Sequence, residues 1–266
     1  MKKNWKALVA IAAVVIIVAV AVVIINMRPA GQAAQPEPGG DSSIVAGKFG
    51  FPVSKISIGE GGTKKASDGK TTTGYNGTCD SAVQAAANYV PLFIDVNVKT
   101  WADQKKTLTG VSQPGPWFEK ATYKGDVVAN TKEFPAPPFD GGWYGRSDVA
   151  AGGMYRVASC EEKKRAVVQV FTGGVEARVN EAPSGFFQTL TLELSWDSDW
   201  KISDAAVVQK GEDFGDRVKD GGPMSVGTLM DMNEEATPVL RNELVNAFFE
   251  NKSRDGWVEY ANAKRQ

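Results

Sequence analysis

Two aspartates, Asp197 and Asp199, lie two positions apart in the segment TLTLELSWDSDWKIS (residues 189–203) and are the first candidates for chemistry. Paired carboxylates can bind a metal ion or serve as an acid and a base. Between two alternating runs, however, acidic residues are typical of a turn, where they favour solvent and turn geometry. We therefore expect Asp197, Ser198 and Asp199 to form an exposed turn rather than a metal site.

Glu193 is the second candidate, because it alternates with Leu192 and Leu194 and so faces away from them. Glu193 or Arg178 could line a pocket on the sheet. The alternative is an ordinary solvated strand face, which we favour.

The chain contains no histidine, which removes the commonest general base and every Ser–His or Cys–His nucleophile. Gly69-Lys70-Thr71 resembles the end of a phosphate-binding loop, but Lys64 stands where that motif requires glycine. We therefore expect no enzyme, no cofactor and no metal.

Cys79 and Cys160 are the two cysteines of the chain. In an oxidising compartment an even pair indicates a disulfide. Closing a loop of about 80 residues would stabilise the fold by on the order of 4 kcal/mol. The alternative is two buried free thiols.

Residues 7–25, ALVAIAAVVIIVAVAVVII, are uncharged and apolar. A helix of this length spans roughly 28 Å, close to the hydrocarbon thickness of a bilayer. Three lysines lie in residues 1–6 and only Arg28 follows closely, which places residues 1–6 in the cytoplasm and the remaining chain outside it. The alternative is a cleaved signal peptide, with GQA at residues 31–33 as the cleavage site.

Three further parts are expected. Residues 26–50 form a Pro/Gly/Ala-rich stalk, residues 51–210 a folded extracytoplasmic domain, and residues 211–266 a C-terminal extension with one helix. After Arg28 the chain carries a net charge of about −5 and no basic stripe. Direct nucleic-acid binding is therefore not expected.

Helices are predicted before strands, with a hairpin turn at Gly173-Gly174 and a loop over residues 134–145. The expected helices cover residues 81–93, 100–110, 116–123 and a segment starting at Thr237, and the expected strands cover residues 51–58, 151–159, 166–172, 175–180, 185–196 and 200–207.

The two tryptophans that flank the Asp197–Asp199 turn are expected to serve packing. Trp196 continues the face formed by Leu190, Leu192 and Leu194, so we expect it to be buried against the helix that carries Val83. Trp200 is expected to cover the end of the hairpin.

Four other aromatic residues are candidates for an interface: Trp143, Tyr144, Trp257 and Tyr260. Amphipathic rings of this kind are enriched where proteins bind partners. The alternative for both pairs is packing against the chain's own core.

Helices followed by an antiparallel meander, closed by an acidic turn between tryptophans, resemble the nuclear-transport-factor-2-like superfamily. The likeness is to membrane-anchored actinobacterial members related to conjugation, which are similar to inner-membrane assembly proteins of type IV secretion. The family's usual turn is Asp-Gly-Asp, and Ser198 departs from it. The segments that carry the resemblance are residues 79–90, 166–171, 192–203 and 255–261.

The resemblance implies an α+β fold, in which a cone-like domain of helices packs on a curved antiparallel sheet after an N-terminal transmembrane helix. It also implies an assembly or adaptor subunit of a bacterial cell-envelope machine, possibly one for conjugative transfer. Its partners would be the membrane, other envelope proteins and a second copy of itself. The first alternative is a domain that binds a small ligand or a cell-wall glycan, and the second is a small-pocket enzyme.

The charge asymmetry around residues 7–25 predicts the topology. A protease added to intact protoplasts should digest the chain beyond about residue 30. Before digestion the protein should sediment with membranes. A soluble chain that starts near Ala34 would contradict the retained anchor.

Overall fold

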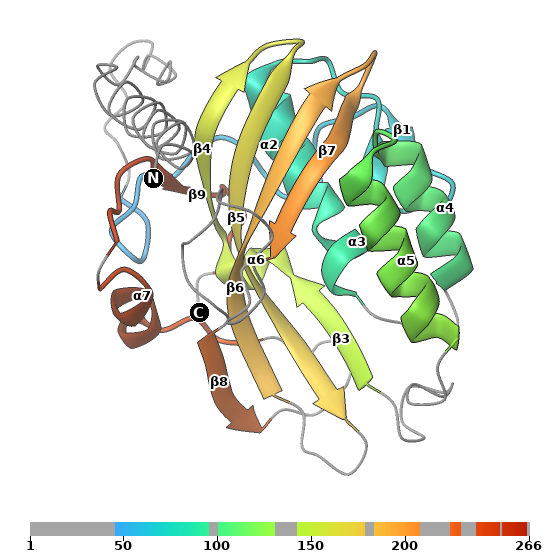
Figure 1. Ribbon diagram of the computed structural model, residues 1–266. Helices are drawn as coiled ribbons and strands as arrows, with labels where there is room; N and C mark the ends of the chain where they lie inside the picture. Colours follow the sequence, from blue (N-terminus) through green and yellow to red (C-terminus); the bar gives the residue numbers. More distant parts are fainter. Residues whose placement is uncertain are drawn as a thin grey trace, which may run out of the picture. The chain divides into compact units, whose positions relative to one another are not determined.

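The computed structural model describes residues 46–95, 101–130, 143–178, 184–207, 224–229, 238–250 and 252–264. They belong to one compact unit that runs from Asp41 to Gln266. Its mixed α+β architecture with an antiparallel sheet is confirmed (Figure 1). The span predicted at residues 7–25 lies outside the described residues. Within the described part, no helix combines the length and the apolar character needed to cross a bilayer.

A seven-stranded antiparallel sheet forms the centre of this unit, in the order β7-β6-β5-β4-β9, with β3 added beside β5 and β8 beside β6. A separate two-stranded hairpin, β1 (Lys64–Lys65) and β2 (Thr72–Thr73), precedes it. The strands of the large sheet are β3 (Trp143–Asp148), β4 (Met154–Glu161), β5 (Arg165–Arg178), β6 (Ser184–Trp196), β7 (Trp200–Val207), β8 (Met224–Leu229) and β9 (Trp257–Glu259).

Strands β5 and β6 are long because each pairs with two different neighbours along its length. The first half of β5 pairs with β4 and its second half with β3. Likewise, β8 pairs with the start of β6 and β7 with its end. The β5–β6 pair therefore joins β3, β4, β7 and β8 directly, and β9 is attached through β4.

The hairpin predicted at Gly173-Gly174 is wrong, because both glycines lie inside β5. Their role is close packing rather than a turn. A Cβ on Gly174 would overlap the Phe186 ring, and a Cβ on Gly173 would crowd Phe187. Glycine thus lets the aromatic side chains of β6 lie directly against the β5 backbone.

The helices have the bounds α2 (Cys79–Tyr89), α3 (Pro91–Ile94), α4 (Trp101–Val111), α5 (Pro116–Asn130), α6 (Val149–Gly152) and α7 (Asn242–Phe248). The first of these begins two residues before the predicted start, because Thr78 is its cap. The Thr78 hydroxyl accepts a hydrogen bond from the Ser81 backbone N–H at 3.2 Å. Pro91 ends α2 and opens α3, as the missing N–H of proline dictates.

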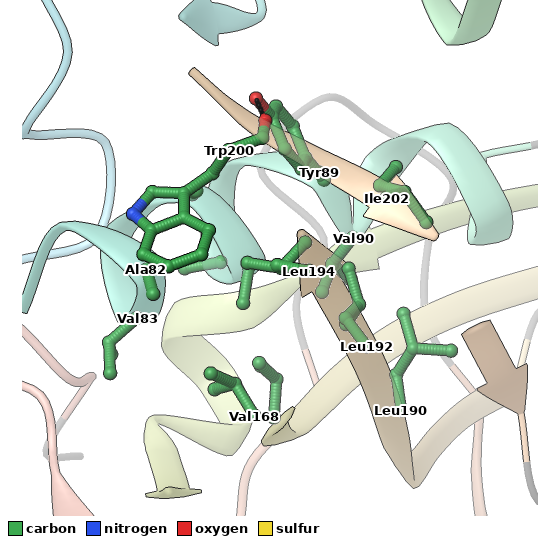
Figure 2. Close-up of a cluster of buried hydrophobic side chains, with 14 of the residues drawn as sticks. Ala82, Val83, Tyr89, Val90, Val168, Leu190, Leu192, Leu194, Trp200 and Ile202 are labelled. Carbon is green, nitrogen blue, oxygen red and sulfur yellow. Dashed lines mark hydrogen bonds between the residues drawn. The ribbon is translucent and has the colours of Figure 1, made fainter. Parts of the chain in front are cut away.

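The main core lies between α2 and one face of the sheet (Figure 2). Leu190, Leu192 and Leu194 of β6 are fully buried there, as their alternation predicts. Small residues of α2 allow the helix to approach the sheet closely. The α2 residues that line this interface are Ala82, Val83, Ala85, Ala86, Tyr89 and Val90.

The expected roles of the two tryptophans are reversed. Trp200 is fully buried, and its indole N–H donates a hydrogen bond to the Ser81 hydroxyl at 3.0 Å. Trp196 is only partly buried and meets Trp200 edge-on, with ring centroids 5.3 Å apart. The two residues face each other across the hairpin and so share a face. The first turn of α2 covers Trp200, whereas Gly77, before the helix, lies against Trp196.

A second, aromatic core lies at the other end of β4. It brings together Phe51, the C-terminal helix α7 and strand β9, with Phe171 and Phe187 from the central strands. The boundary expected after residue 210 therefore does not separate two units. The C-terminal segment instead supplies a helix and two strands to the same domain.

We expect Trp200→Ala to lower the free energy of unfolding by about 3–5 kcal/mol, since it empties a fully buried site and removes the N–H that donates to the Ser81 hydroxyl. Trp196→Ala is the matched control and should cost clearly less. Thermal unfolding followed by circular dichroism measures both. Equal losses would contradict the reversed assignment.

Candidate functional site

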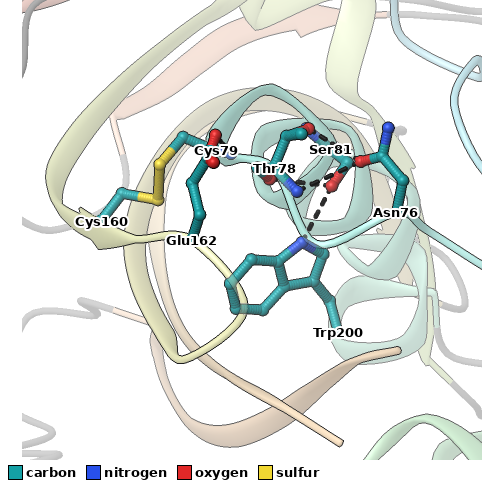
Figure 3. Close-up of a disulfide and its surroundings, with 7 residues drawn as sticks. All are labelled: Asn76, Thr78, Cys79, Ser81, Cys160, Glu162 and Trp200. Atoms are coloured by element: carbon teal, nitrogen blue, oxygen red, sulfur yellow. Dashed lines mark hydrogen bonds between the residues drawn. A yellow bond between two sulfur atoms is a disulfide. The ribbon is translucent and has the colours of Figure 1, made fainter. Parts of the chain in front are cut away.

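Three loops meet at the end of the sheet where the β4–β5 and β6–β7 hairpins turn. A disulfide joins Cys79 at the start of α2 to Cys160 near the end of β4, as predicted, with an S–S distance of 2.06 Å (Figure 3). Neither cysteine is free. The covalent bond fixes the N-terminus of α2 to the edge of this hairpin.

Asp199 ties the second hairpin to the segment that leads into α2. Its carboxylate accepts hydrogen bonds from the backbone N–H groups of Gly74 at 2.7 Å, Tyr75 at 2.9 Å and Trp200 at 2.9 Å. The expectation of an entirely exposed turn is therefore wrong for Asp199. It holds for Asp197 and Ser198, which are both exposed.

Backbone hydrogen bonds complete this arrangement. The Lys163 N–H donates to the Gly77 carbonyl at 2.8 Å, and the Trp196 N–H donates to the Lys164 carbonyl at 2.9 Å. Each loop is thus bonded to the next. We call this surface the hairpin end; it comprises residues 74–80, 161–165 and 196–200.

The side chains exposed at the hairpin end are mostly charged. The acidic ones are Asp80, Glu161, Glu162 and Asp197, and the basic ones are Lys163, Lys164 and Arg165. The loops are rigidly braced and carry no group of three or more metal-ligating residues in the described part of the chain.

The segment Gly69-Lys70-Thr71 is a turn organised by Asp68. The Asp68 carboxylate accepts from the backbone N–H groups of Lys70 and Thr71 at 2.8 and 2.9 Å, and from the Thr71 hydroxyl at 2.6 Å. Burial raises the pKa of the Asp68 carboxyl, but these hydrogen bonds outweigh it and leave the pKa below its ordinary value. The N–H groups that a phosphate would need are already used.

Glu193 forms a two-point ion pair with Arg165 of the neighbouring strand. The two nitrogen–oxygen distances are 3.0 and 2.8 Å. This contact braces β5 against β6 on the face away from α2. The Arg178 side chain, the other pocket candidate, lies outside the described residues.

Trp143 and Tyr144 lie in strand β3, so the loop predicted over residues 134–145 is wrong at its end. Their backbones pair with Arg178 and Ala177 of β5. The structure does not describe their side chains, and their part in an interface stays a prediction.

Trp257 and Tyr260 are buried within the domain, with 3% and 0% of their surface exposed. Trp257 belongs to the aromatic core, and the Arg156 guanidinium lies 5.4 Å from its ring centre. Tyr260 packs on Tyr155 at 4.7 Å between ring centres. In the single chain both rings therefore serve internal packing.

Asp95, which the sequence did not single out, follows α3 and holds the edge of β3. Its carboxylate oxygen Oδ1 accepts from the Ser147 N–H at 2.7 Å and the Ser147 hydroxyl at 2.6 Å. Burial raises its pKa, and the bonds from Ser147 and the charges of Arg146 and Lys70 reverse only part of that rise. No local sequence pattern marks Asp95 as a structural residue, because its partner Ser147 is 52 residues away.

Asp199, Glu193 and Asp95 each bond to another part of the fold and so hold structure together. The sequence of the chain matches no protein-family model, no curated protein and no solved structure.

We expect Asp199→Ala to lower the free energy of unfolding by about 1–3 kcal/mol, because it leaves three backbone N–H groups without their acceptor. Asp197→Ala is the control and should change it by less than about 0.5 kcal/mol. Denaturant titration measures both variants. Equal effects would show that the Asp199 bonds carry no stability.

Asp95 predicts a pH dependence. Because its pKa is higher in the folded than in the unfolded chain, the folded state binds more protons, and the free energy of unfolding falls as pH rises above about 3.9. Asp95→Asn removes the charge and keeps an acceptor for Ser147. The melting temperature of the variant minus that of the natural chain should grow from about pH 4 to pH 7. A constant difference would contradict the effect of burial.

Proposed function

We propose that this chain is a non-catalytic assembly or adaptor subunit of a bacterial cell-envelope machine, such as one for conjugative transfer. In this proposal residues 7–25 anchor it in the cytoplasmic membrane, and the folded unit lies outside the cytoplasm with the nuclear-transport-factor-2-like fold that the sequence resembles. The observation that carries the proposal is the solid packing between α2 and the sheet.

Enzymes and ligand-binding proteins of this fold can use the concave side of the sheet as a pocket. Here fully buried apolar side chains fill the layer between α2 and the sheet, including Leu192, Val168 and Trp200. The carboxylate of Glu193 lies on the opposite face, paired with Arg165. A filled interior supports a scaffold rather than a binding pocket.

The hairpin end is the surface that we assign to the partner. Its loops are held by the Cys79–Cys160 disulfide, the Asp199 bonds and backbone hydrogen bonds, so little freedom is lost when another protein binds there. The exposed charged side chains of the hairpin end favour recognition by charge complementarity. A membrane tether raises the local concentration of the domain, so modest affinity is enough for assembly.

The test is purification of the tagged full-length chain from detergent-solubilised membranes. We expect other envelope proteins to co-purify in a fixed ratio. The double variant Glu162→Lys/Asp197→Lys, which reverses two exposed charges of the hairpin end, should lose them while keeping its melting temperature. The control Glu243→Lys/Glu250→Lys makes the same charge change on and beside α7 and should retain them.

A chain that purifies alone would overturn the adaptor proposal. If it purifies alone and a cell-wall glycan fragment raises its melting temperature, the ligand-binding alternative takes its place. Loss of partners in both double variants would mean that net charge, not the hairpin end, governs assembly.

A further inference from the structure

The first described segment of the chain, residues 46–58, docks on the C-terminal strand. We call it the strap. Val53 bridges to Glu259 in parallel orientation, the Ser54 N–H donates to the Glu259 carbonyl at 2.9 Å, and the Glu259 N–H donates to the Pro52 carbonyl at 2.8 Å. The strap thus adds to the edge of β9 as an extra short strand.

Side chains strengthen this docking. Glu259 is buried, with 1% of its surface exposed, and its carboxylate accepts from the Phe49 N–H at 3.2 Å. Phe51 inserts into the aromatic core beside Phe249, at 5.2 Å between ring centres. At the far end of the strap, Ile58 exchanges two hydrogen bonds with the Asn262 side chain.

The strap and its acceptor are far apart in sequence, with a separation of 210 between Phe49 and Glu259. Closing a loop of this length costs conformational entropy before the contacts can form. A strap from a neighbouring anchored chain can therefore compete with the chain's own strap for the edge of β9.

A glycine pivot connects the strap to the rest of the unit. Gly59 has a φ of +87°, which favours glycine, and a Cβ on it would meet nothing within 4 Å. Directly after it, the Asn88 side chain donates to the Glu60 carbonyl at 3.1 Å and fixes the chain to α2. The Gly59 N–H also donates to the Asn88 side-chain oxygen at 3.2 Å, so a swing of the strap about Gly59 breaks this hydrogen bond with α2.

We propose that the strap is exchanged between two copies of this chain, each strap docking on β9 of the other copy. Exchange keeps every contact of the strap and changes only the conformation of the pivot and its hydrogen bond to Asn88, which is why swapping of an end segment is an accessible route to a dimer. The proposal depends on the proposed membrane anchor in one respect. The anchor would supply the high local concentration of neighbouring straps.

That concentration follows from the length of the tether. Residues 26–45 lie between the predicted span and the strap, and 20 residues reach at most about 70 Å. Confinement by a short linker gives effective concentrations in the millimolar range. When two neighbouring chains are anchored, the strap of one therefore meets the β9 edge of the other far more often than it would in solution.

The test uses two differently tagged full-length chains expressed together, one with Ile58→Cys and the other with Asn262→Cys. A short bismaleimide added to membranes reacts with these thiols, because the natural cysteines are bonded to each other. Exchange predicts cross-linked heterodimer at least tenfold above the collision control, in which Lys106→Cys on α4 replaces Asn262→Cys.

A hinge variant makes the test specific to exchange. Gly59→Ala disfavours the left-handed pivot of the closed chain and should raise the heterodimer yield several-fold. Gly69→Ala is the matched control, since Gly69 also has a positive φ of +67° and open space but lies outside the pivot. It should leave the yield unchanged.

Heterodimer at the level of the collision control would overturn the exchange, provided that Ile58→Cys/Asn262→Cys in one chain cross-links internally. An equal rise with both alanine variants would overturn it as well. The adaptor proposal fails separately, when no envelope protein co-purifies, so the two failures are distinguishable.

Discussion

The burial of the Trp200 indole between α2 and the sheet is the interaction on which the rest of the domain depends. Its N–H donates to Ser81, and the Tyr89 hydroxyl donates to the Trp200 carbonyl at 2.9 Å. These two bonds fix both ends of α2 over one strand, and Figure 3 shows the bond to Ser81. Burial raises the pKa of the Tyr89 hydroxyl, which stays a neutral donor. With α2 fixed, Cys79 and Asp199 can hold the loops of the hairpin end.

Local patterns predicted those parts of the fold that local physics decides. The alternation of residues 185–196 gave the strand and its buried face, and the even cysteine count gave the disulfide. Tertiary context decided the others. Gly173 and Gly174 look like a turn in sequence, and only the neighbouring phenylalanines explain their place in a strand. Trp196 and Trp200 have equivalent patterns, so only the start of α2 determines which one is buried.

The turn between β6 and β7 has a left-handed backbone conformation at Ser198. Ser198 has a φ of +58°, in the left-handed region where glycine has no steric penalty. Serine keeps this geometry at some cost in strain. The candidate site was harder to predict, because the donors that bond to Asp199 and Asp95, at Gly74, Tyr75 and Ser147, are distant in sequence.

Strand β4 connects the two surfaces to which we assign function. Its first residue, Met154, pairs with Glu259 of β9, where the strap docks, and its end carries Cys160 at the hairpin end. A displacement that enters through the strap therefore passes along a single hydrogen-bonded strand to the disulfide and into α2. Backbone ladders resist such a displacement because many bonds share it. In the proposed adaptor role, this stiffness would connect the tether to the partner surface.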